Sequence, residues 1–452
     1  MFFEQIVHSD LGCASYVLAS TETREAMVVD PRWEIEPYLD LAKRHGFDIT
    51  RIVETHNHAD HVSGHGRLAA ATGATILIHE AAGVGYPHHA LADGEVITLG
   101  DLRVHIIHTP GHRPEHIALA IEDVSRGSDP WMVLTGDSLF IGDVARPDLA
   151  VEATDGAMQL FDSLHERILR LPDFVAVYPA HVAGSLCGRV SSEVHSSTIG
   201  YERRYNQSLA IEERDSFVHH MTQNLPHRPP NMGRIVAENR GPLRTDPVQI
   251  HTLNVEEAAE MIASGAIPFD VRATVDYLTA HIPASIHVPI SGGQFGTRAG
   301  FVVPGDVPIV LVAANPKEVD LAATSLRAVA YENVAGFLQL EHWIAKGREV
   351  VSIDSVSVAD LNQMLGDGVT VLDVREPDEF QTSSVSGALN IPYPVLPARL
   401  AEVPSNGLVA VICGSGSRSA ISASLLERAG RWPVANVQGG MTAWETAGLP
   451  VK

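Results

Sequence analysis

The C-terminal part of the chain repeats itself, and this repeat constrains the fold more strongly than any other feature of the sequence. The segment Phe269–Arg272 returns 103 positions later as Leu372–Arg375, with Asp-Val-Arg in common. Two further pairs of segments stand at the same spacing: His281–Pro289 with Ser384–Pro392, and Asn333–Gly336 with Asn436–Gly439. Three agreements at one offset indicate two copies of the same domain.

Each copy alternates short apolar runs with stretches of helical pattern, in the order strand–helix–strand–helix. This alternation is typical of an α/β domain with a mostly parallel sheet and helices on both faces. The remaining N-terminal half is long enough for a domain of its own. We therefore predict three domains, at residues 1–245, 246–350 and 351–452. The Pro-rich stretch Leu225–Pro230 is predicted to be an irregular tail that crosses to the second domain.

Charge and composition exclude several classes of function. The net charge is −23, and Lys and Arg form no cluster of the kind that binds nucleic acid or anionic lipid. The longest apolar runs, such as Pro308–Ala314, have the length of strands rather than of membrane spans. Met1–Tyr16 contains no apolar run of the signal-peptide kind. Three cysteines are too few for a disulfide framework, so we expect a cytoplasmic protein that binds neither nucleic acid nor membrane.

The segment Thr55–His61, Thr-His-Asn-His-Ala-Asp-His, carries the strongest chemical signal in the first domain. It directly follows a predicted strand. Because residues two apart in an extended segment point the same way, His56 and His58 are expected to face one ion. A turn then brings Asp60 and His61 to a neighbouring position.

Three more candidates follow later strands of the first domain, each in a loop marked by Gly or Pro: His112, Asp137 and His181. The predicted strands are Glu25–Asp30, Ile52–Thr55, Thr75–His79, Leu102–His108, Trp131–Thr135 and Val175–Tyr178. One histidine in a loop is usually a solvated or hydrogen-bonded side chain. Four strand ends that all deliver His or Asp favour a metal site at one edge of a sheet.

This pattern resembles the metallo-β-lactamase fold, an αββα sandwich with metal at one edge, over residues 1–235. The segments Thr109–His116 and Ile141–Leu149 resemble the persulfide dioxygenase branch, in particular its members that are fused to rhodanese domains. The resemblance implies one Fe(II) held by His56, His112 and Asp137, with open positions for O₂ and substrate. Four further residues would surround this iron or bind a second metal: His58, Asp60, His61 and His181.

In the third domain an apolar strand runs into Cys413, and Arg418 and Ser419 follow five and six positions later. The residues between Cys413 and Arg418 are all small: Gly414, Ser415, Gly416 and Ser417. Such a loop can curl so that backbone N–H groups point at the sulfur. The helix that begins after it, together with Arg418, would stabilise a negatively charged sulfur. A lone cysteine is often a buried core residue, but this loop favours a nucleophile that accepts and holds a sulfur atom.

Here the sequence resembles the rhodanese family across the whole third domain, which implies that Cys413 and Arg418 are catalytic. Three segments stand where that family has them: Asp373–Phe380, Gly387–Pro392 and Gln438–Trp444. The second domain has the same framework but contains no cysteine, and Ala314 stands near the equivalent position. We predict that it is an inactive rhodanese-like α/β domain that spaces, packs or forms an oligomer contact.

A thioester hydrolase of the glyoxalase II type is the main alternative for the first domain, because it shares the fold. It would hold two zinc ions with seven residues: His56, His58, Asp60, His61, His112, Asp137 and His181. All seven are present, so the ligand types fit either site. The motifs contain no cysteine, so the ligand set is not the thiolate type that selects structural zinc. The segment Ile141–Leu149 and the sulfur chemistry of the third domain favour oxidation.

We therefore expect an enzyme that oxidises a low-molecular-weight thiol persulfide with O₂ to sulfite, coupled to sulfane-sulfur transfer through Cys413. Sulfite and thiosulfate would be its other partners, in either direction of transfer, with no organic cofactor. A non-enzymatic sulfur carrier or sensor is the third possibility. Cys187 follows His181 by six positions and could lie near the substrate mouth, but we interpret it as an incidental small residue. Cys13 is assigned no role, and a homo-oligomer is expected.

Overall fold

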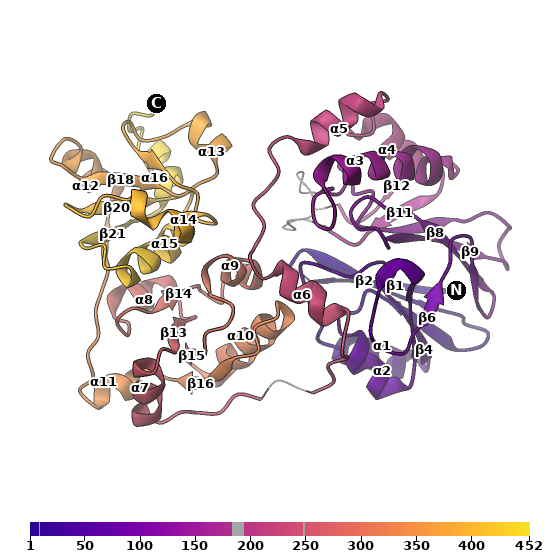
Figure 1. The fold of residues 1–452 in the computed structure, drawn as a ribbon, viewed down its shortest axis with the longest axis horizontal. Coiled ribbons are helices and arrows are strands. Elements are labelled where there is room, and N and C mark those ends of the chain that lie inside the picture. Colours follow the sequence, from indigo (N-terminus) through magenta and orange to yellow (C-terminus); the bar gives the residue numbers. More distant parts are fainter. Residues whose placement is uncertain (9, 183–193, 247–248) are drawn as a thin grey trace. The chain divides into compact units, whose positions relative to one another are not determined.

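The computed structural model describes residues 1–8, 10–182, 194–246 and 249–452 (Figure 1). The chain forms two compact units. The first consists of Met1–Pro247 with Arg327–Ala330, and the second of Val248–Leu326 with Tyr331–Lys452. Within the described ranges, no helix has both the length and the apolar character that a membrane crossing requires.

Two six-stranded sheets face each other in the first unit. The first sheet contains, in spatial order, β1 (Phe2–His8), β2 (Cys13–Ala19), β3 (Glu25–Val29), β4 (Asp48–Val53), β5 (Thr75–His79) and β6 (His89–Leu91). The second contains β12 (Ser197–Thr198), β11 (Ala176–Pro179), β10 (Met132–Gly136), β9 (Ile117–Asp123), β8 (Leu102–His108) and β7 (Val96–Leu99). Successive side chains of a strand point to opposite faces, so Tyr16 and Leu18 pack against the second sheet while Val17 packs outward.

Helices cover the outer faces of both sheets (Figure 1). Tyr38 and Leu68 pack on Ile52 of the first sheet, and Leu160 and Phe217 pack on the second. The helices are α1 (Glu36–His45), α2 (His65–Thr72), α3 (Ala153–Asp162), α4 (Ile199–Tyr205), α5 (Arg214–Thr222) and α6 (Met232–Asn239). The short helical turns are Glu80–Ala82, Ser163–Arg167 and Ile168–Arg170. The predicted αββα sandwich is confirmed.

The prediction for the Pro-rich stretch of the first unit is wrong. Leu225–Pro230 has no helix or strand, as expected, but it does not cross to the second domain. The chain forms α6 after it, and Met232 and Ile235 of that helix are buried. The proline stretch is therefore a connection within the first unit.

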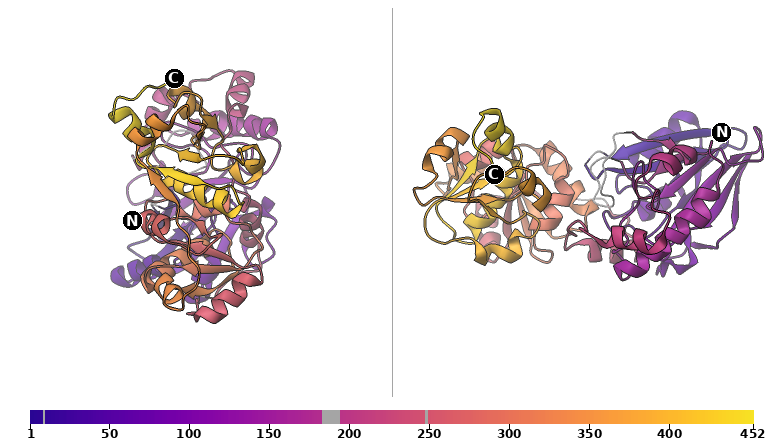
Figure 2. Two further views of the ribbon diagram at one scale, coloured as in Figure 1. Left: turned by 90° about the vertical axis from the view of Figure 1, so that its left-hand side faces the viewer. Right: turned by 90° about the horizontal axis from the view of Figure 1, so that it is seen from above.

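The second unit contains two smaller sheets, and every strand pair in them is parallel. One has the order β14 (Ile286–His287), β13 (Ile267–Asp270), β15 (Ile309–Val312) and β16 (Val334–Leu338). The other has the order β17 (Asp354–Val356), β21 (Val434–Val437), β20 (Val409–Ile412), β18 (Thr370–Asp373) and β19 (Leu389–Asn390). Figure 2 shows the yellow strands of this second sheet among helices of its own domain.

The helices of the second unit fall into two sets, one for each sheet. With the first sheet belong α7 (Val255–Ala263), α8 (Thr274–Thr279), α9 (Phe295–Val302), α10 (Pro316–Ala328) and α11 (Leu340–Ala345). With the second belong α12 (Val358–Met364), α13 (Pro377–Thr382), α14 (Leu396–Arg399), the turn Leu400–Glu402, α15 (Ser417–Arg428) and α16 (Gly440–Thr446). The predicted pair of parallel α/β domains is confirmed.

The sequence repeat is visible in the side-chain bonds of these two domains. Arg272 donates to both oxygens of Asp270, with Nη2 2.6 Å from Oδ2, and also to the carbonyl of Ala280. Arg375 makes the same bonds to Asp373, at 2.7 Å, and to the carbonyl of Ser383. Each pair is buried and joins the end of a central strand to the following loop, so the Asp-x-Arg motif is structural in both copies.

Replacing Arg375 with alanine should destabilise the third domain by about 3 kcal/mol, because the buried carboxylate of Asp373 loses its partner. Chemical denaturation followed by tryptophan fluorescence measures this loss. Arg399 serves as the control, because its ion pair with Glu402 lies on the surface. Arg399→Ala should leave the unfolding midpoint unchanged, and an equal loss in both variants would contradict the assignment.

Candidate metal centre and sulfur-transfer site

The predicted metal motif forms a loop at the carboxyl end of β4, and a buried carboxylate holds that loop in place. Asp30 accepts hydrogen bonds from the backbone N–H of Thr55 at 2.7 Å and from its hydroxyl at 2.8 Å. The loop residues Thr55–His58 are all buried. The three later candidates, His112, Asp137 and His181, follow β8, β10 and β11, so four loops deliver their side chains to one edge of the sandwich.

His56, His112 and Asp137 form one buried group whose ligand atoms lie within 4.8 Å of one another. Nε2 of His112 is 3.3 Å from Oδ2 of Asp137, and Nε2 of His56 is 3.9 Å from the same oxygen. These two nitrogens and this oxygen have no hydrogen-bond partner among the described residues. Buried polar atoms of this kind need compensation, and a metal cation between them provides it.

The protonation of this group also fits a metal. Nδ1 of His112 lies 3.0 Å from the carbonyl of Arg146, so Nδ1 carries the proton and Nε2 presents its lone pair to the centre. Burial lowers the pKa of both His56 and His112, which keeps the imidazoles neutral. Burial alone would raise the pKa of Asp137, but the nearby His181 and His112 outweigh it and hold that pKa low. Two neutral imidazoles and one carboxylate are the form that binds a divalent metal.

His58 does not join this group. Its Nε2 lies 3.2 Å from Oδ1 of Asp30 and 3.3 Å from Oε2 of Glu54. Burial lowers the pKa of His58, but these two carboxylates outweigh it and raise that pKa well above its ordinary value. The expectation that His56 and His58 face one ion is wrong for this structure, because β4 ends at Val53 and the motif runs as turns rather than as a strand.

Asp60, His61 and His181 form a second group beside the first. Asp60 lies 3.2 Å from Nδ1 of His61 and 2.9 Å from Nε2 of His181. Nδ1 of His181 is in turn 2.8 Å from Oδ1 of Asp137, which links the two groups. His58, Asp60 and His61 also lie close enough together to hold an ion. The structure thus brings all seven predicted residues to one region and divides them into two sets.

His116 is a functional residue that the sequence reasoning missed. Its Nε2 accepts a hydrogen bond from the backbone N–H of Asp137 at 2.8 Å, and its Nδ1 lies 2.8 Å from the hydroxyl of Thr109. Burial, helped by His112, lowers the pKa of His116 to about 3, so the ring stays neutral and can accept. A Cβ on Gly136 would lie 2.5 Å from Nε2 of His116, which requires glycine there. The only signal in the sequence was its place four residues after His112.

A cavity of about 530 Å³ lies next to the metal motif. Its lining comes from three parts of the first unit: Ala59, Arg113 and Pro114; Leu149 and Ala150; and Arg228, Pro229, Pro230, Met232, Gly233, Val236 and Arg240. Three arginines and no carboxylate line it. Arg113 donates to Glu115 at 2.8 Å, and Glu115 also accepts from Asn57 in the metal loop.

Cys413 stands at the end of β20, where its side chain is buried and its sulfur faces the loop. The backbone N–H of Gly416 donates to Sγ at 3.1 Å, and the hydroxyl of Ser419 lies 3.5 Å from it. Gly416 adopts φ 104°, at the N-terminus of α15. Gly440 touches the back of the loop, where a Cβ would lie 2.2 Å from the Cys413 carbonyl oxygen. The predicted curled loop is therefore present, with Gly414, Ser415 and Ser417 completing it.

Arg418 is placed by a partner that the sequence did not reveal. Nη1 and Nη2 of Arg418 each lie 2.7 Å from an oxygen of Glu379, which is the bidentate geometry that guanidinium prefers. Glu379 belongs to α13, in the segment that resembles the rhodanese family. The charge of Arg418 is therefore balanced within the loop's own domain.

In the second domain, the loop equivalent to the Cys413 loop donates a hydrogen bond to a side chain of the same domain. Asp270 pairs with Val312 as Asp373 pairs with Ile412, so Ala313 occupies the place of Cys413. An alanine near this position was predicted, and the structure identifies it as Ala313. The backbone N–H of Ala314 donates to the carboxylate of Glu318 at 2.9 Å, in place of a sulfur. This domain has no group that could carry sulfur.

Cys13 belongs to none of the candidate ligand groups among the described residues, although Asp60 and His181 lie near it. Cys13 is buried in β2, and burial raises its pKa to about 12, so it remains a thiol. Its neighbour Ala14 donates to the carbonyl of Ala180, one residue before His181. Cys187 lies outside the described residues.

Comparisons with known proteins agree with this architecture. The model of the metallo-beta-lactamase superfamily matches residues 8–181, and that of the rhodanese-like domain matches residues 357–447. The solved metallo-beta-lactamase from Staphylococcus aureus is 29% identical with a TM-score of 0.67, and the match covers 75% of this chain and 98% of that one. The chain belongs to the metallo-beta-lactamase superfamily and carries a rhodanese-like domain at its C-terminal end.

Two groups of relatives match the first unit. Human persulfide dioxygenase ETHE1, mitochondrial, is 34% identical over 202 residues, which cover 44% of this chain and 71% of the relative. A hydroxyacylglutathione hydrolase from Synechococcus is 31% identical over 201 residues, which cover 43% of this chain and 74% of the relative. The predicted fusion of a persulfide dioxygenase homologue with a rhodanese-like domain is confirmed. The identity values do not separate the two enzyme types.

His116→Ala should weaken metal binding by about 10- to 100-fold, because the N–H of Asp137 loses the acceptor that orients this ligand. Titration of the metal-free protein with Fe(II) or Zn(II) measures the affinity. His165→Ala is the control, since that half-buried ring lies on the outer turn after α3. Unchanged affinity in His116→Ala would show that Asp137 is positioned without it.

Proposed function

We propose that the first unit oxidises a thiol persulfide with O₂ at a single iron held by His56, His112 and Asp137. The observation that carries this proposal is the separation of these three residues from His58. A group of two histidines and one carboxylate leaves coordination positions open, as in non-haem iron oxygenases. When bound, Fe(II) would supply the one-electron chemistry with O₂ that no side chain offers.

A dinuclear hydrolase is the second candidate, and the hydroxyacylglutathione hydrolase relatives favour it. Two zinc ions would need His58 and Asp60 as ligands. In this structure Nε2 of His58 lies 3.2 Å from Asp30 and 3.3 Å from Glu54, and Asp60 lies within hydrogen-bond distance of His61 and His181. The two carboxylates favour a protonated His58, which would compete with its binding a second metal and supports the mononuclear proposal.

The overall reaction converts R–S–SH, O₂ and water into R–SH, sulfite and two protons. The terminal S–S bond breaks, the outer sulfur is oxidised, and O₂ is reduced. The chain's own residues prepare the place for this reaction. The carbonyl of Arg146 fixes the tautomer of His112, His116 fixes the backbone of Asp137, and burial of the ligands excludes bulk water.

The cavity lined by Arg113, Arg228 and Arg240 supports an anionic thiol as the carrier of the persulfide. Its volume of about 530 Å³ lies within the usual range for small-ligand sites. In a chain with net charge −23, a cavity with three arginines and no carboxylate in its lining favours negatively charged ligands. Carboxylates or phosphates on the thiol would bind there while the sulfur reaches the metal loop at Ala59.

We further propose that Cys413 exchanges sulfane sulfur among persulfide, sulfite and thiosulfate. The N–H of Gly416 already donates to its sulfur, and a persulfide anion would be held in the same way. Fusion of the two activities raises the effective concentration of a shared intermediate, because both sites belong to one chain. The proposed outcome is thiosulfate formation or its reverse.

Metal analysis combined with an oxygen electrode tests the iron proposal. Protein loaded with Fe(II) should contain about one iron per chain and consume O₂ with glutathione persulfide. His112→Ala should lose both metal and O₂ uptake, whereas His58→Ala should retain one metal, because it is not a ligand in this arrangement. Two zinc ions per chain with thioester cleavage in the absence of O₂ would establish the hydrolase instead.

Cys413→Ser should leave O₂ consumption unchanged and shift the product from thiosulfate to sulfite. The first unit still makes sulfite, but the sulfur acceptor has been removed. Chromatography of the monobromobimane-labelled products measures both species. Arg399→Ala removes an exposed ion pair of the same domain and is the control. An unchanged product ratio in Cys413→Ser would refute the coupling.

A further inference from the structure

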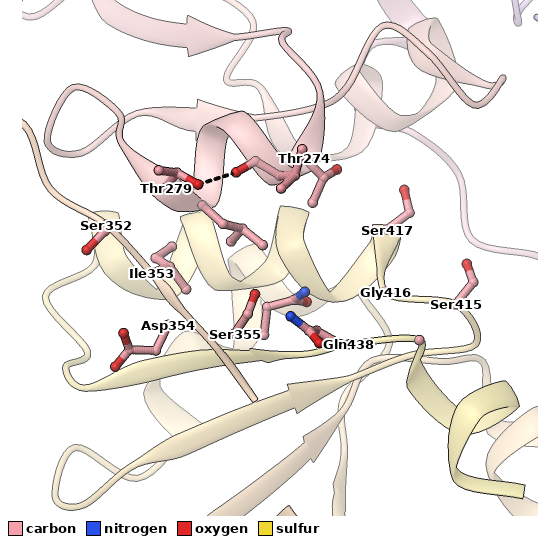
Figure 3. A pocket seen from close by; sticks show the side chains of 14 residues that line it. Thr274, Thr279, Ser352, Ile353, Asp354, Ser355, Ser415, Gly416, Ser417 and Gln438 are labelled. Carbon is pink, nitrogen blue, oxygen red and sulfur yellow. Dashed lines mark hydrogen bonds between the residues drawn. The ribbon is translucent and has the colours of Figure 1, made fainter. Parts of the chain in front are cut away.

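A cavity of about 680 Å³ opens beside the Cys413 loop, and the second domain forms one of its walls (Figure 3). The loop contributes Ser415, Gly416 and Ser417, and α8 of the second domain contributes Thr274 and Thr279 from the opposite side. The inactive domain therefore borders the sulfur-transfer site instead of only spacing the chain.

A second element of the inactive domain reaches the loop itself. Nη1 of Arg298, on α9, donates to the hydroxyl of Ser417 at 3.1 Å. Phe301, on the same helix, packs edge-on against Tyr393 of the third domain, with ring centroids 5.6 Å apart. Two contacts from one helix fix the place of the Arg298 guanidinium next to the residue that precedes Arg418.

The guanidinium groups of Arg418 and Arg298 differ in whether a carboxylate pairs with them. Arg418 is neutralised by the bidentate contact with Glu379. For Arg298, no carboxylate within the described ranges forms an ion pair. Tyr393 lies within the electrostatic reach of both arginines: burial raises its pKa to about 12, both guanidinium charges oppose that shift, and Glu376 adds to it. The second domain thus adds at the loop a guanidinium that forms no ion pair within the described ranges.

We infer that Arg298 is a substrate-binding residue that binds the oxygen atoms of sulfite, or of the sulfonate group of thiosulfate, at Cys413. This inference rests on the proposed sulfurtransferase function. The Cys413 thiolate attacks the outer sulfur of thiosulfate, and a new S–S bond forms as the old one breaks. The electron pair of the broken bond leaves with sulfite, and Cys413 keeps the sulfur as a persulfide anion. The reverse reaction makes thiosulfate, with the same charges on both sides.

The physical reason is the charge of the ligands. Sulfite and thiosulfate are dianions, and the loop already holds a negatively charged sulfur with backbone N–H groups. A planar guanidinium offers paired donors that match two oxygens of one oxyanion. Arg418 is committed to Glu379, so Arg298 is the guanidinium available for this task.

Kinetics of the full chain in the thiosulfate–cyanide reaction test the inference. Arg298→Gln should raise the KM for thiosulfate about tenfold, because a charge-assisted hydrogen bond to the oxyanion is lost. The kcat should change less than twofold, and the reaction of glutathione persulfide with cyanide, in which no sulfonate takes part, should be unaffected. Arg298→Lys keeps the positive charge but loses the paired N–H donors of the guanidinium. It should therefore recover part of the affinity for thiosulfate. Lys346→Gln removes a charge from an exposed ion pair in the same domain and should have no effect.

Alkylation of Cys413 provides a second measurement that needs no turnover. Iodoacetate is an anion and iodoacetamide is neutral, so Arg298→Gln should lower the ratio of their rates severalfold. An unchanged KM and an unchanged ratio would overturn the inference, and so would equal losses with every substrate, since those indicate a structural role. Turnover that persists in Cys413→Ser would instead refute the proposed sulfurtransferase function.

Discussion

The buried negative charge of Asp137 is the constraint on which the arrangement of the candidate metal site depends. The Asp137 carboxylate is completely buried, and an ionised carboxylate in such a place is costly unless charges and hydrogen bonds surround it. His181 and His112 face its oxygens, and His116 holds its backbone. Nε2 of His56 and Nε2 of His112 both lie within 4 Å of one oxygen of Asp137, so a metal ion there would complete the compensation. The layers of the sandwich serve to bring these loops to one edge.

The loop around Cys413 would also have to stabilise a buried negative charge, and it offers other groups for this. Its charge would sit on a sulfur at the N-terminus of α15, where backbone N–H groups and the helix dipole stabilise an anion without a metal. The inactive copy shows what happens when the sulfur is absent, because the carboxylate of Glu318 accepts a hydrogen bond from the corresponding loop. In both loops a backbone N–H thus donates to a side-chain acceptor, the Glu318 carboxylate in one and the Cys413 sulfur in the other.

Much of the fold could be predicted from the sequence because it depends on local patterns. The strands Thr75–His79 and Leu102–His108 have the predicted bounds, and the duplicated Asp-x-Arg motif marks the same strand end in both α/β domains. The metal residues could be found because each follows a strand in a short loop. The conformation of His58 could not, because it is decided by Asp30, a partner from another strand.

Glu379 and Arg298 could not be found from the sequence, because each acts through a partner far away in the chain. Arg298 contacts Ser417 across 119 positions and a domain boundary, and no spacing in the sequence announces such a pair. A duplicated domain makes this kind of contact available, because the Asp270–Arg272 pair keeps the copy folded whether or not its loop holds a cysteine. The second domain contains no cysteine, so under the proposal above its contribution to sulfur transfer is the guanidinium that it places beside Ser417.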